Sequence, residues 1–356
     1  QTVTDEALVY SLDEGRTCLD EIKEKIALPP YDAKAARILA TASHRDIEID
    51  PEVVSQLRKF VDILCQAYRS NAFHSFEHAC HVTMSVDKFL KRIVSPNMDG
   101  DIKTLHEYTH GMTSDPLLHM AIVLSAVIHD ADHYGISNVQ LAKEEPQMAQ
   151  AYRGQSIAEQ NSLDLSWTVF MGDEFRLLRR AMFVDRSSML RFRQVVVNIV
   201  LVRWVDHNFA ILRFDSLTAT HTYASIPPTS LQATDIFDKD LNALRKNRWD
   251  KAFAGTGAAD NDLRATIVME HIIQASDVSH TMQHWHIYRK WNERLFMEMT
   301  DAYHQGRMGK DPAEFWYQGE LGFFDNYIIP LAKKLKECNV FGVSSDEDLN
   351  YALQNR

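Results

Sequence analysis

Three short stretches of the chain combine histidine with acidic residues, the side chains that most often bind metal ions in proteins. They cover residues 73–81, 129–133 and 274–280. In the first stretch His74 and His78 lie four positions apart, so they share one face if the segment is helical. Histidine nitrogens combined with aspartate oxygens form a mixed ligand set that suits zinc. An aspartate that bridges to a harder ion such as magnesium would complete a two-metal hydrolytic centre.

Each of these residues also has a purely structural interpretation. A single histidine on a helix is more often a hydrogen-bonded structural residue than a ligand, and the chain has 16 histidines, some of which must cluster by chance. An aspartate in an apolar helix, such as Asp277, can pair with a basic neighbour. The adjacent His129 and Asp130 follow an apolar segment directly, which favours the metal interpretation because an unpaired buried charge is costly.

The segments around these residues have helical periodicity. Apolar residues recur at steps of three and four from Val82 to Ile93, and Pro96 ends that pattern. Residues 118–127 are nearly all apolar and predict a buried helix that begins near Asp115-Pro116. No segment alternates like a strand, so the prediction is an all-α fold. Further helices are expected over residues 156–170, 187–200, 240–253, 265–299 and 323–338.

Composition excludes several classes of protein. The 356 residues carry a net charge of −11, which excludes a nucleic-acid surface but allows a small anionic substrate at a metal site. No apolar run is long enough for a membrane span. The four cysteines form no C-x-x-C pair and indicate a reducing, intracellular compartment. The first residue is Gln1, so we expect a piece of a longer protein. We expect a cytoplasmic location. Association with the cytoskeleton or flagellum, through regions outside this chain, stays an open alternative.

The motifs resemble those of HD-type metal phosphohydrolases and, more narrowly, the catalytic domain of class I cyclic-nucleotide phosphodiesterases, most closely the trypanosomatid branch. The resemblance covers roughly residues 53–355 and rests on Phe-His-Ser-Phe-Glu-His-Ala, Ile-His-Asp-Ala-Asp-His-Tyr-Gly, Ala-Glu-Gln-Asn-Ser, Ala-Thr-Asp-Ile, Gln-Ala-Ser-Asp-Val-Ser-His and Gly-Phe-Phe-Asp. It implies a compact single all-α domain of about sixteen helices. Residues 53–356 would form this domain, with residues 1–52 as an N-terminal helical segment packed on it, and a homodimer is left open.

The resemblance also implies a ligand set. A tightly held Zn²⁺ would bind four side chains: His78, His129, Asp130 and Asp277. Asp130 would bridge to a second ion, Mg²⁺ or Mn²⁺, that is otherwise held by water. The two ions would generate a hydroxide that opens the phosphodiester ring of cAMP, or of cGMP, and ends the cyclic-nucleotide signal by forming the 5′-nucleoside monophosphate.

The remaining roles follow from the same resemblance. His74 would be the general acid for the O3′ leaving group, while His133 and Glu159 would hydrogen-bond water ligands and orient the centre. The residues expected around the substrate are Asp235, Leu295, Glu320 and Phe323, with Leu295 and Phe323 on either side of the purine ring.

The chain departs from the family pattern at two single positions. Ser75 stands where the family has asparagine, which is a mild change because serine still forms hydrogen bonds. Glu320 stands where the family has a purine-binding glutamine, and Gln318 faces another direction on a helix. An ionised carboxylate only accepts hydrogen bonds. We therefore expect weaker nucleotide binding and a preference moved from cAMP towards cGMP.

The segment 201–232 is an insertion relative to the family and contains the loop signal Ser225-Ile226-Pro227-Pro228. It adjoins Asp235, so we expect it to impair activity, although surface insertions carry a modest entropic cost. A catalytically impaired binding or scaffold protein is therefore an alternative to an active enzyme. A hydrolase of nucleoside triphosphates is a third interpretation, which the lack of basic residues near the metal motifs disfavours.

Overall fold

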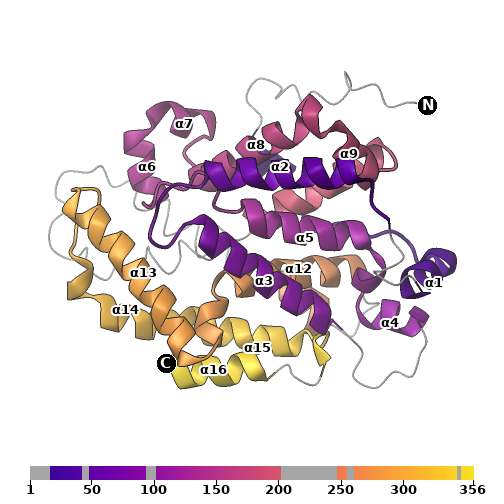
Figure 1. The fold of residues 1–356 in the computed structure, drawn as a ribbon. Helices are drawn as coiled ribbons and strands as arrows, with labels where there is room; N and C mark the ends of the chain where they lie inside the picture. The colour runs from indigo at the N-terminus through magenta and orange to yellow at the C-terminus, as the bar shows by residue number, and fades with distance from the viewer. Residues whose placement is uncertain (1–16, 42–47, 94–101, 202–246, 255–259, 343–345) are drawn as a thin grey trace.

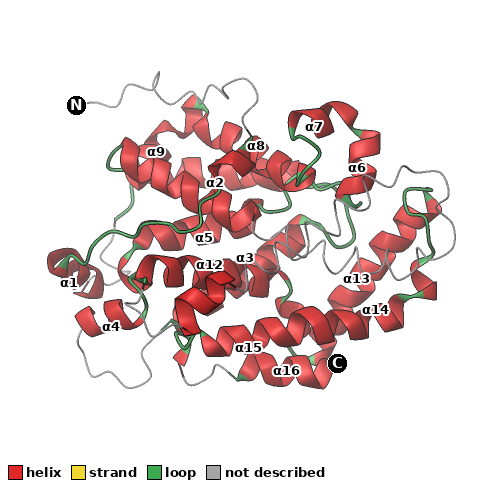
Figure 2. Ribbon diagram, turned by 180° about the vertical axis from the view of Figure 1, so that it is seen from behind, coloured by secondary structure: helices red, strands yellow, loops and turns green. Residues whose placement is uncertain are grey.

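A computed structural model describes residues 17–41, 48–93, 102–201, 247–254, 260–342 and 346–356 (Figure 1). Within these ranges every regular element is helical, as Figure 2 shows, which confirms the all-α prediction. Asp235 and nearly all of the segment 201–232 lie outside the described residues. Among the described helices, none is both long and apolar enough to cross a lipid bilayer.

The α-helices follow the chain in a simple order. They are α1 (Ala33–Thr41), α2 (Pro51–Ala67), α3 (Phe76–Arg92), α4 (Ile102–Tyr108), α5 (Pro116–Ile128), α6 (Asn138–Glu144), α7 (Pro146–Ala151), α8 (Ile157–Met171), α9 (Arg176–Met182), a helix over residues 186–201, α12 (Asn261–Asp277), α13 (Trp285–His304), α14 (Trp316–Phe323), α15 (Ile329–Glu337) and α16 (Glu347–Asn355). Short 3₁₀ turns are η2 (Cys18–Glu21), η3 (Met112–Ser114), η4 (Asp173–Phe175), η6 (Ser279–Met282) and η7 (Pro312–Glu314), and π-helical segments are η5 (Asp250–Ala254) and η8 (Phe324–Ile328).

Helix α5 forms the centre of the described fold. Asp115 caps it by accepting a hydrogen bond from the Leu118 amide (3.2 Å), and Pro116 occupies the first turn. Most of its side chains are buried, and it packs against α3 and α12 (Figure 1). Because α5 ends at Ile128, the pair His129 and Asp130 leaves the helix in the interior of the molecule.

The single helix expected over residues 265–299 is wrong. The chain forms α12 and α13 instead, separated by a break over residues 278–284. Gln283 is extended (φ −127°, ψ 178°) and the His284 side chain caps α13. The break places Asp277 at the last position of α12 and lets α13 take a new direction. The helix expected over 323–338 is present, because residues 323–337 are helical throughout, with the π segment η8 between α14 and α15.

An N-terminal strap, Thr17–Leu28, lies across the helix 186–201 and α12. Its backbone is bound by side chains of those two helices. Asn198 accepts from the Lys23 amide (3.2 Å) and donates to the Lys23 carbonyl (2.7 Å). Thr266 accepts from the Ile26 amide (2.9 Å). The strap is therefore held by hydrogen bonds between its backbone and these side chains, as well as by the burial of Ile26.

The expected division of the chain after residue 52 falls in the first turn of α2. Asp50 caps α2 through the Glu52 amide (2.8 Å), and Pro51 opens the helix. Assignment of residues 1–52 to a separate segment stays a prediction.

Candidate metal centre

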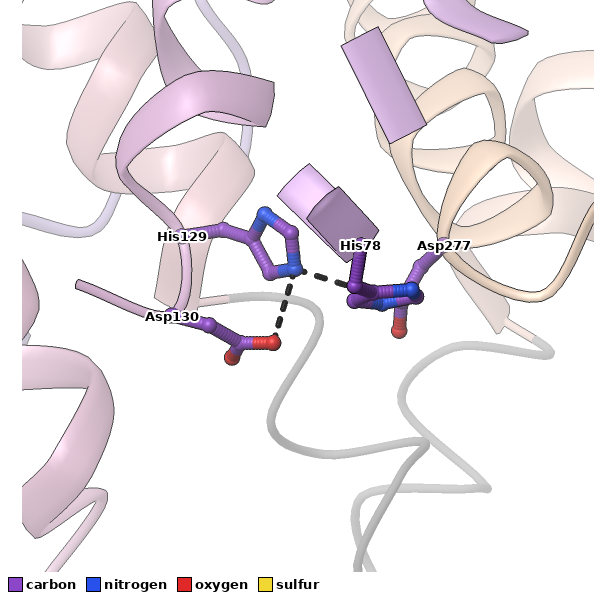
Figure 3. A group of neighbouring side chains, drawn as sticks. All are labelled: His78, His129, Asp130 and Asp277. Atoms are coloured by element: carbon purple, nitrogen blue, oxygen red, sulfur yellow. Dashed lines mark hydrogen bonds and ion pairs between the residues drawn. The ribbon is translucent and has the colours of Figure 1, made fainter. Parts of the chain in front are cut away.

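Four buried side chains from three helices meet at one point, and they are His78, His129, Asp130 and Asp277 (Figure 3). Each offers a nitrogen or oxygen atom, and these atoms all lie within 4.8 Å of one another. His78 lies on the first turn of α3, which Ser75 caps through the His78 amide (3.4 Å). The other three side chains follow from the ends of α5 and α12.

The distances between these groups are those of a set of ligand atoms that face a common centre. His78 Nε2 lies 3.0 Å from Asp277 Oδ1, and His129 Nε2 lies 2.9 Å from Asp130 Oδ2 and 3.5 Å from Asp277 Oδ1. His129 Nδ1 donates to the Ala126 carbonyl (2.8 Å), which leaves the lone pair on Nε2, the atom that faces the carboxylates.

The protonation of the cluster suits a cation. Burial lowers the pKa of His78, more than the neighbouring Asp277 raises it, so the imidazole is neutral and can act as a ligand. Two imidazoles and two carboxylates form a nitrogen–oxygen set of the kind that binds a divalent metal ion. The residues present therefore fit the divalent metal ion that the sequence motifs indicate.

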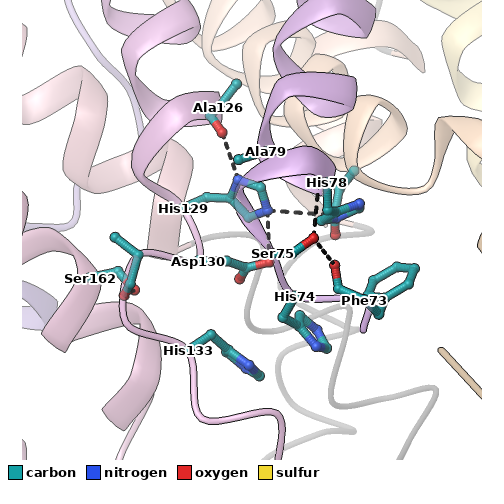
Figure 4. A network of polar contacts seen from close by, with 12 residues as sticks. Phe73, His74, Ser75, His78, Ala79, Ala126, His129, Asp130, His133 and Ser162 are labelled. Atoms are coloured by element: carbon teal, nitrogen blue, oxygen red, sulfur yellow. Dashed lines mark hydrogen bonds and ion pairs between the residues drawn. The ribbon is translucent and has the colours of Figure 1, made fainter. Parts of the chain in front are cut away.

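A second cluster, formed by His74, His133 and Glu298, lies beside the first. Glu298 Oε1 accepts from His74 Nδ1 (2.5 Å), and Oε2 accepts from the amides of Phe73 (2.7 Å) and His74 (3.0 Å). The rings of His74 and His133 are stacked with centroids 4.0 Å apart; Figure 4 shows both beside the metal-ligand candidates. Although burial raises the pKa of Glu298, the histidines and the Phe73 amide bring it down to about 2, so Glu298 is ionised.

Glu298 was not among the site residues predicted from the sequence. Its only signal is its position on α13, where Tyr288, Trp291, Leu295 and Glu298 follow one another at steps of three and four. This spacing places the four side chains on one face of the helix. Trp291 packs its ring 5.2 Å from the His78 ring. One face of α13 therefore contacts both the metal-ligand candidates and the His74 cluster.

The remaining predicted residues near the metal ligands take other positions. Glu159 is buried in the first turn of α8, where it accepts from Asn138 Nδ2 (3.0 Å), and it is a member of neither cluster. His81, which the sequence groups with His74 and His78, donates from Nε2 to Gln283 Oε1 (3.3 Å).

The predicted purine-binding residues lie on α13 and α14. Leu295, Glu320 and Phe323 are all half-buried, and Phe323 stacks on Tyr327 with ring centroids 5.3 Å apart. Glu320 Oε2 accepts from the Tyr288 hydroxyl (2.6 Å). Burial raises the pKa of the Glu320 carboxyl, and the Tyr288 hydroxyl opposes that rise. Asp235, the other predicted pocket residue, is outside the described part of the chain.

The sequence is similar to those of cyclic-nucleotide phosphodiesterases. The chain is 22% identical over 275 residues to a probable 3′,5′-cyclic-AMP phosphodiesterase of Caenorhabditis elegans, which covers 74% of this chain and 34% of that protein. It is 19% identical over 290 residues to a cGMP-specific phosphodiesterase of Dictyostelium discoideum, covering 79% and 51%. The chain thus spans about a third to half of the length of these relatives.

Solved structures support the fold. The phosphodiesterase domain of the RhoPDE fusion protein from the choanoflagellate Salpingoeca rosetta superimposes with a TM-score of 0.58 at 16% sequence identity, covering 99% of this chain and 96% of that one. The family described as 3′,5′-cyclic nucleotide phosphodiesterase matches residues 73–342, a range that contains both clusters and the predicted purine-binding residues. The chain therefore belongs to the 3′,5′-cyclic nucleotide phosphodiesterase family.

Proposed function

We propose that this chain hydrolyses 3′,5′-cyclic nucleotides to 5′-nucleoside monophosphates. The observation that carries the proposal is the buried set of two histidines and two aspartates directly beside the His74–Glu298 pair. The relatives include a probable cAMP phosphodiesterase, a cGMP-specific phosphodiesterase and a human calcium/calmodulin-dependent phosphodiesterase of dual specificity. These relatives support cyclic nucleotides as the substrate class. The finer relationship to the trypanosomatid branch, a cytoplasmic location and homodimerisation belong to the same proposal.

His78, His129, Asp130 and Asp277 would hold the tight ion, for which Zn²⁺ is the proposed metal. Asp130 would reach a second ion, Mg²⁺ or Mn²⁺, with His133 and Glu159 orienting its water ligands. When bound, such ions lower the pKa of a water molecule and offset charge on the phosphoryl oxygens.

The proton needed by the leaving group comes from His74. Since Glu298 is ionised and accepts from His74 Nδ1, it holds the ring in one orientation with Nε2 directed away from it. The carboxylate also stabilises the imidazolium form. His74 in that form donates its Nε2 proton to O3′ as the ester bond breaks, which avoids an alkoxide leaving group.

The test is hydrolysis of cAMP and cGMP by the purified chain with Mg²⁺, before and after chelation. The expected result is turnover that chelation abolishes and added metal restores. Asp277→Asn should lower both bound metal, measured by elemental analysis, and turnover. Asp132→Asn is the matched control, because Asp132 lies in the same 129–133 motif, belongs to neither cluster and has φ +61°, which asparagine tolerates. Turnover that survives complete chelation would contradict the metal centre.

The second candidate is a catalytically impaired binding protein. Glu320 at a purine-binding position and the insertion over residues 201–232 motivate it. Deletion of residues 201–232 separates the two candidates, because an impaired enzyme gains turnover when the insertion is removed. A deletion variant no more active than this chain would contradict impairment by the insertion.

A further inference from the structure

The Glu320 carboxyl lies at the end of a chain of hydrogen bonds that all run towards it. Trp316 Nε1 donates to Asn292 Oδ1 (3.2 Å), Asn292 Nδ2 donates to Tyr288 Oη (3.4 Å), and Tyr288 Oη donates to Glu320 Oε2 (2.6 Å). An indole nitrogen can only donate, so it fixes the Asn292 amide with its oxygen towards Trp316 and its nitrogen towards Tyr288. The direction of every bond is thereby set, and Glu320 always receives a donor on Oε2.

The surroundings of Glu320 contain little charge. In the described part of the chain no charged side chain of α13, α14 or η8 contributes to the pKa of Glu320. Burial raises that pKa, and the Tyr288 hydroxyl lowers it by a smaller amount. Tyr288 is itself held neutral, because burial and the Glu320 carboxyl raise its pKa. Burial therefore favours the neutral acid form of Glu320 more than it does for an exposed glutamate.

We propose that the protonation state of Glu320 selects the purine base, with the acid form matching adenine and the carboxylate matching guanine. This inference rests on the proposed function. A neutral carboxyl has one donor and one acceptor, which complement the adenine ring nitrogen N1 and the amino group. A carboxylate only accepts, which complements the adjacent N1–H and N2–H₂ donors of guanine.

Two features of α14 support this assignment. Glu320 and Phe323 are three positions apart and share a face of the helix, so a base stacked on Phe323 presents its edge to Glu320. Tyr288 donates to Oε2, which leaves Oε1 to carry the proton in the acid form. Tyr288 is therefore a positioning residue for the base-selecting carboxyl.

The experiment is the ratio of kcat/KM for cAMP to kcat/KM for cGMP, measured from about pH 5.5 to about pH 8.5 with the same metal. The ratio cancels the pH dependence that both substrates share through His74 and the metal ligands. We expect it to fall about tenfold or more as pH rises, because a carboxylate opposite the adenine edge loses one hydrogen bond and faces a lone pair. Glu320→Gln should give a ratio that does not change with pH. A constant ratio in the unchanged chain would overturn the inference.

Tyr288→Phe tests the positioning role. Its hydroxyl stabilises the carboxylate, so its removal should move the change in ratio to higher pH. The matched control is Tyr317→Phe on α14, because that side chain is 71% exposed. A Tyr288→Phe variant that loses activity equally with both substrates, without moving the pH of the change, would show a structural role alone and overturn the positioning assignment.

Binding of the products AMP and GMP, measured by calorimetry over the same pH range, separates failure of this inference from failure of the proposed function. A pH-dependent binding ratio without turnover upholds base selection and rejects hydrolysis. Turnover with a pH-independent ratio upholds hydrolysis and rejects base selection. No binding of either product at any pH rejects both.

Discussion

The Glu298 carboxylate receives hydrogen bonds from the His74 ring and from the amides of Phe73 and His74, so it fixes both the ring and the turn that leads into α3. We predict that Glu298→Gln lowers kcat by about a hundredfold with little change in KM, because the imidazolium of His74 loses its counter-charge. Glu293→Gln on the same helix is the control, since that side chain is 58% exposed and pairs only with Arg289 in the described structure. Equal kcat values for the two variants would contradict the role of Glu298.

Glu298 also makes the free energy of unfolding depend on pH in the acid range. Its folded pKa of about 2 lies below the value of 4.5 for an unperturbed glutamate, so the unfolded chain takes up this proton first. The stability that Glu298 contributes is therefore complete above about pH 4.5 and is lost as pH falls towards about 2. Urea denaturation between these values should show a steeper loss for the unchanged chain than for Glu298→Gln. Parallel curves would contradict this prediction.

The local motifs, read with the family resemblance, predicted the metal-ligand candidates but not the residues that contact them. The stretches 73–81, 129–133 and 274–280 contain the two histidines and two aspartates that the structure brings together. Glu298 and Tyr288 were missed, because a carboxylate or tyrosine within a helix carries no local sign of a partner. Glu298 meets His74 across 224 positions of the chain. The roles of the predicted site residues stay predictions until variants are measured.

At the scale of helices, the N-terminus of α5 is held by a capping residue that also forms an ion pair. Asp115 at its N-terminus is buried and binds the Arg191 guanidinium on the helix 186–201 through two bonds (2.5 and 3.1 Å). We predict that Asp115→Asn destabilises the protein by about 2 kcal/mol, because asparagine retains the cap but loses the buried ion pair. The free energy of unfolding in urea measures this loss.

The control for Asp115→Asn is Asp87→Asn, which removes an exposed pair with Lys91 on α3. It should change stability by less than about 0.5 kcal/mol. If both variants lose the same amount, the Asp115 pair does not secure the start of α5.

The limits of helices were predictable where capping residues or proline stand, and not where such signals are absent. Asp115 and Pro116 predicted the start of α5 correctly. The division between α12 and α13 was missed, because residues 278–282 are all buried and contain no glycine or proline that would mark the end of a helix. The break becomes visible only with the tertiary contacts, among them the Asn355 amide, which donates to the carbonyls of Thr281 (3.0 Å) and Gln283 (2.7 Å).

At the scale of the whole molecule, the strap Thr17–Leu28 connects helices that are distant in sequence. Asn198 is fully buried and binds both backbone groups of Lys23. We predict that Asn198→Ala increases hydrogen exchange of strap amides about tenfold, because two backbone groups lose their partner. Mass-spectrometric exchange measures this directly. Gln140→Ala, which removes an exposed bond to Glu144, should leave the strap unchanged, and equal protection in both variants would contradict the anchoring role.

The position of the strap in the chain has a consequence for biosynthesis. Its Ile26 amide is satisfied by Thr266, which lies 240 residues later. At a ribosomal rate of about 5–20 residues per second, the strap leaves the exit tunnel roughly ten to fifty seconds before that partner is made. During this interval Ile26 lacks its partner on α12, although the helix 186–201 on which the strap also lies has already been made. The strap can therefore complete its contacts only after α12 has been synthesised, later than the central helices α3 and α5.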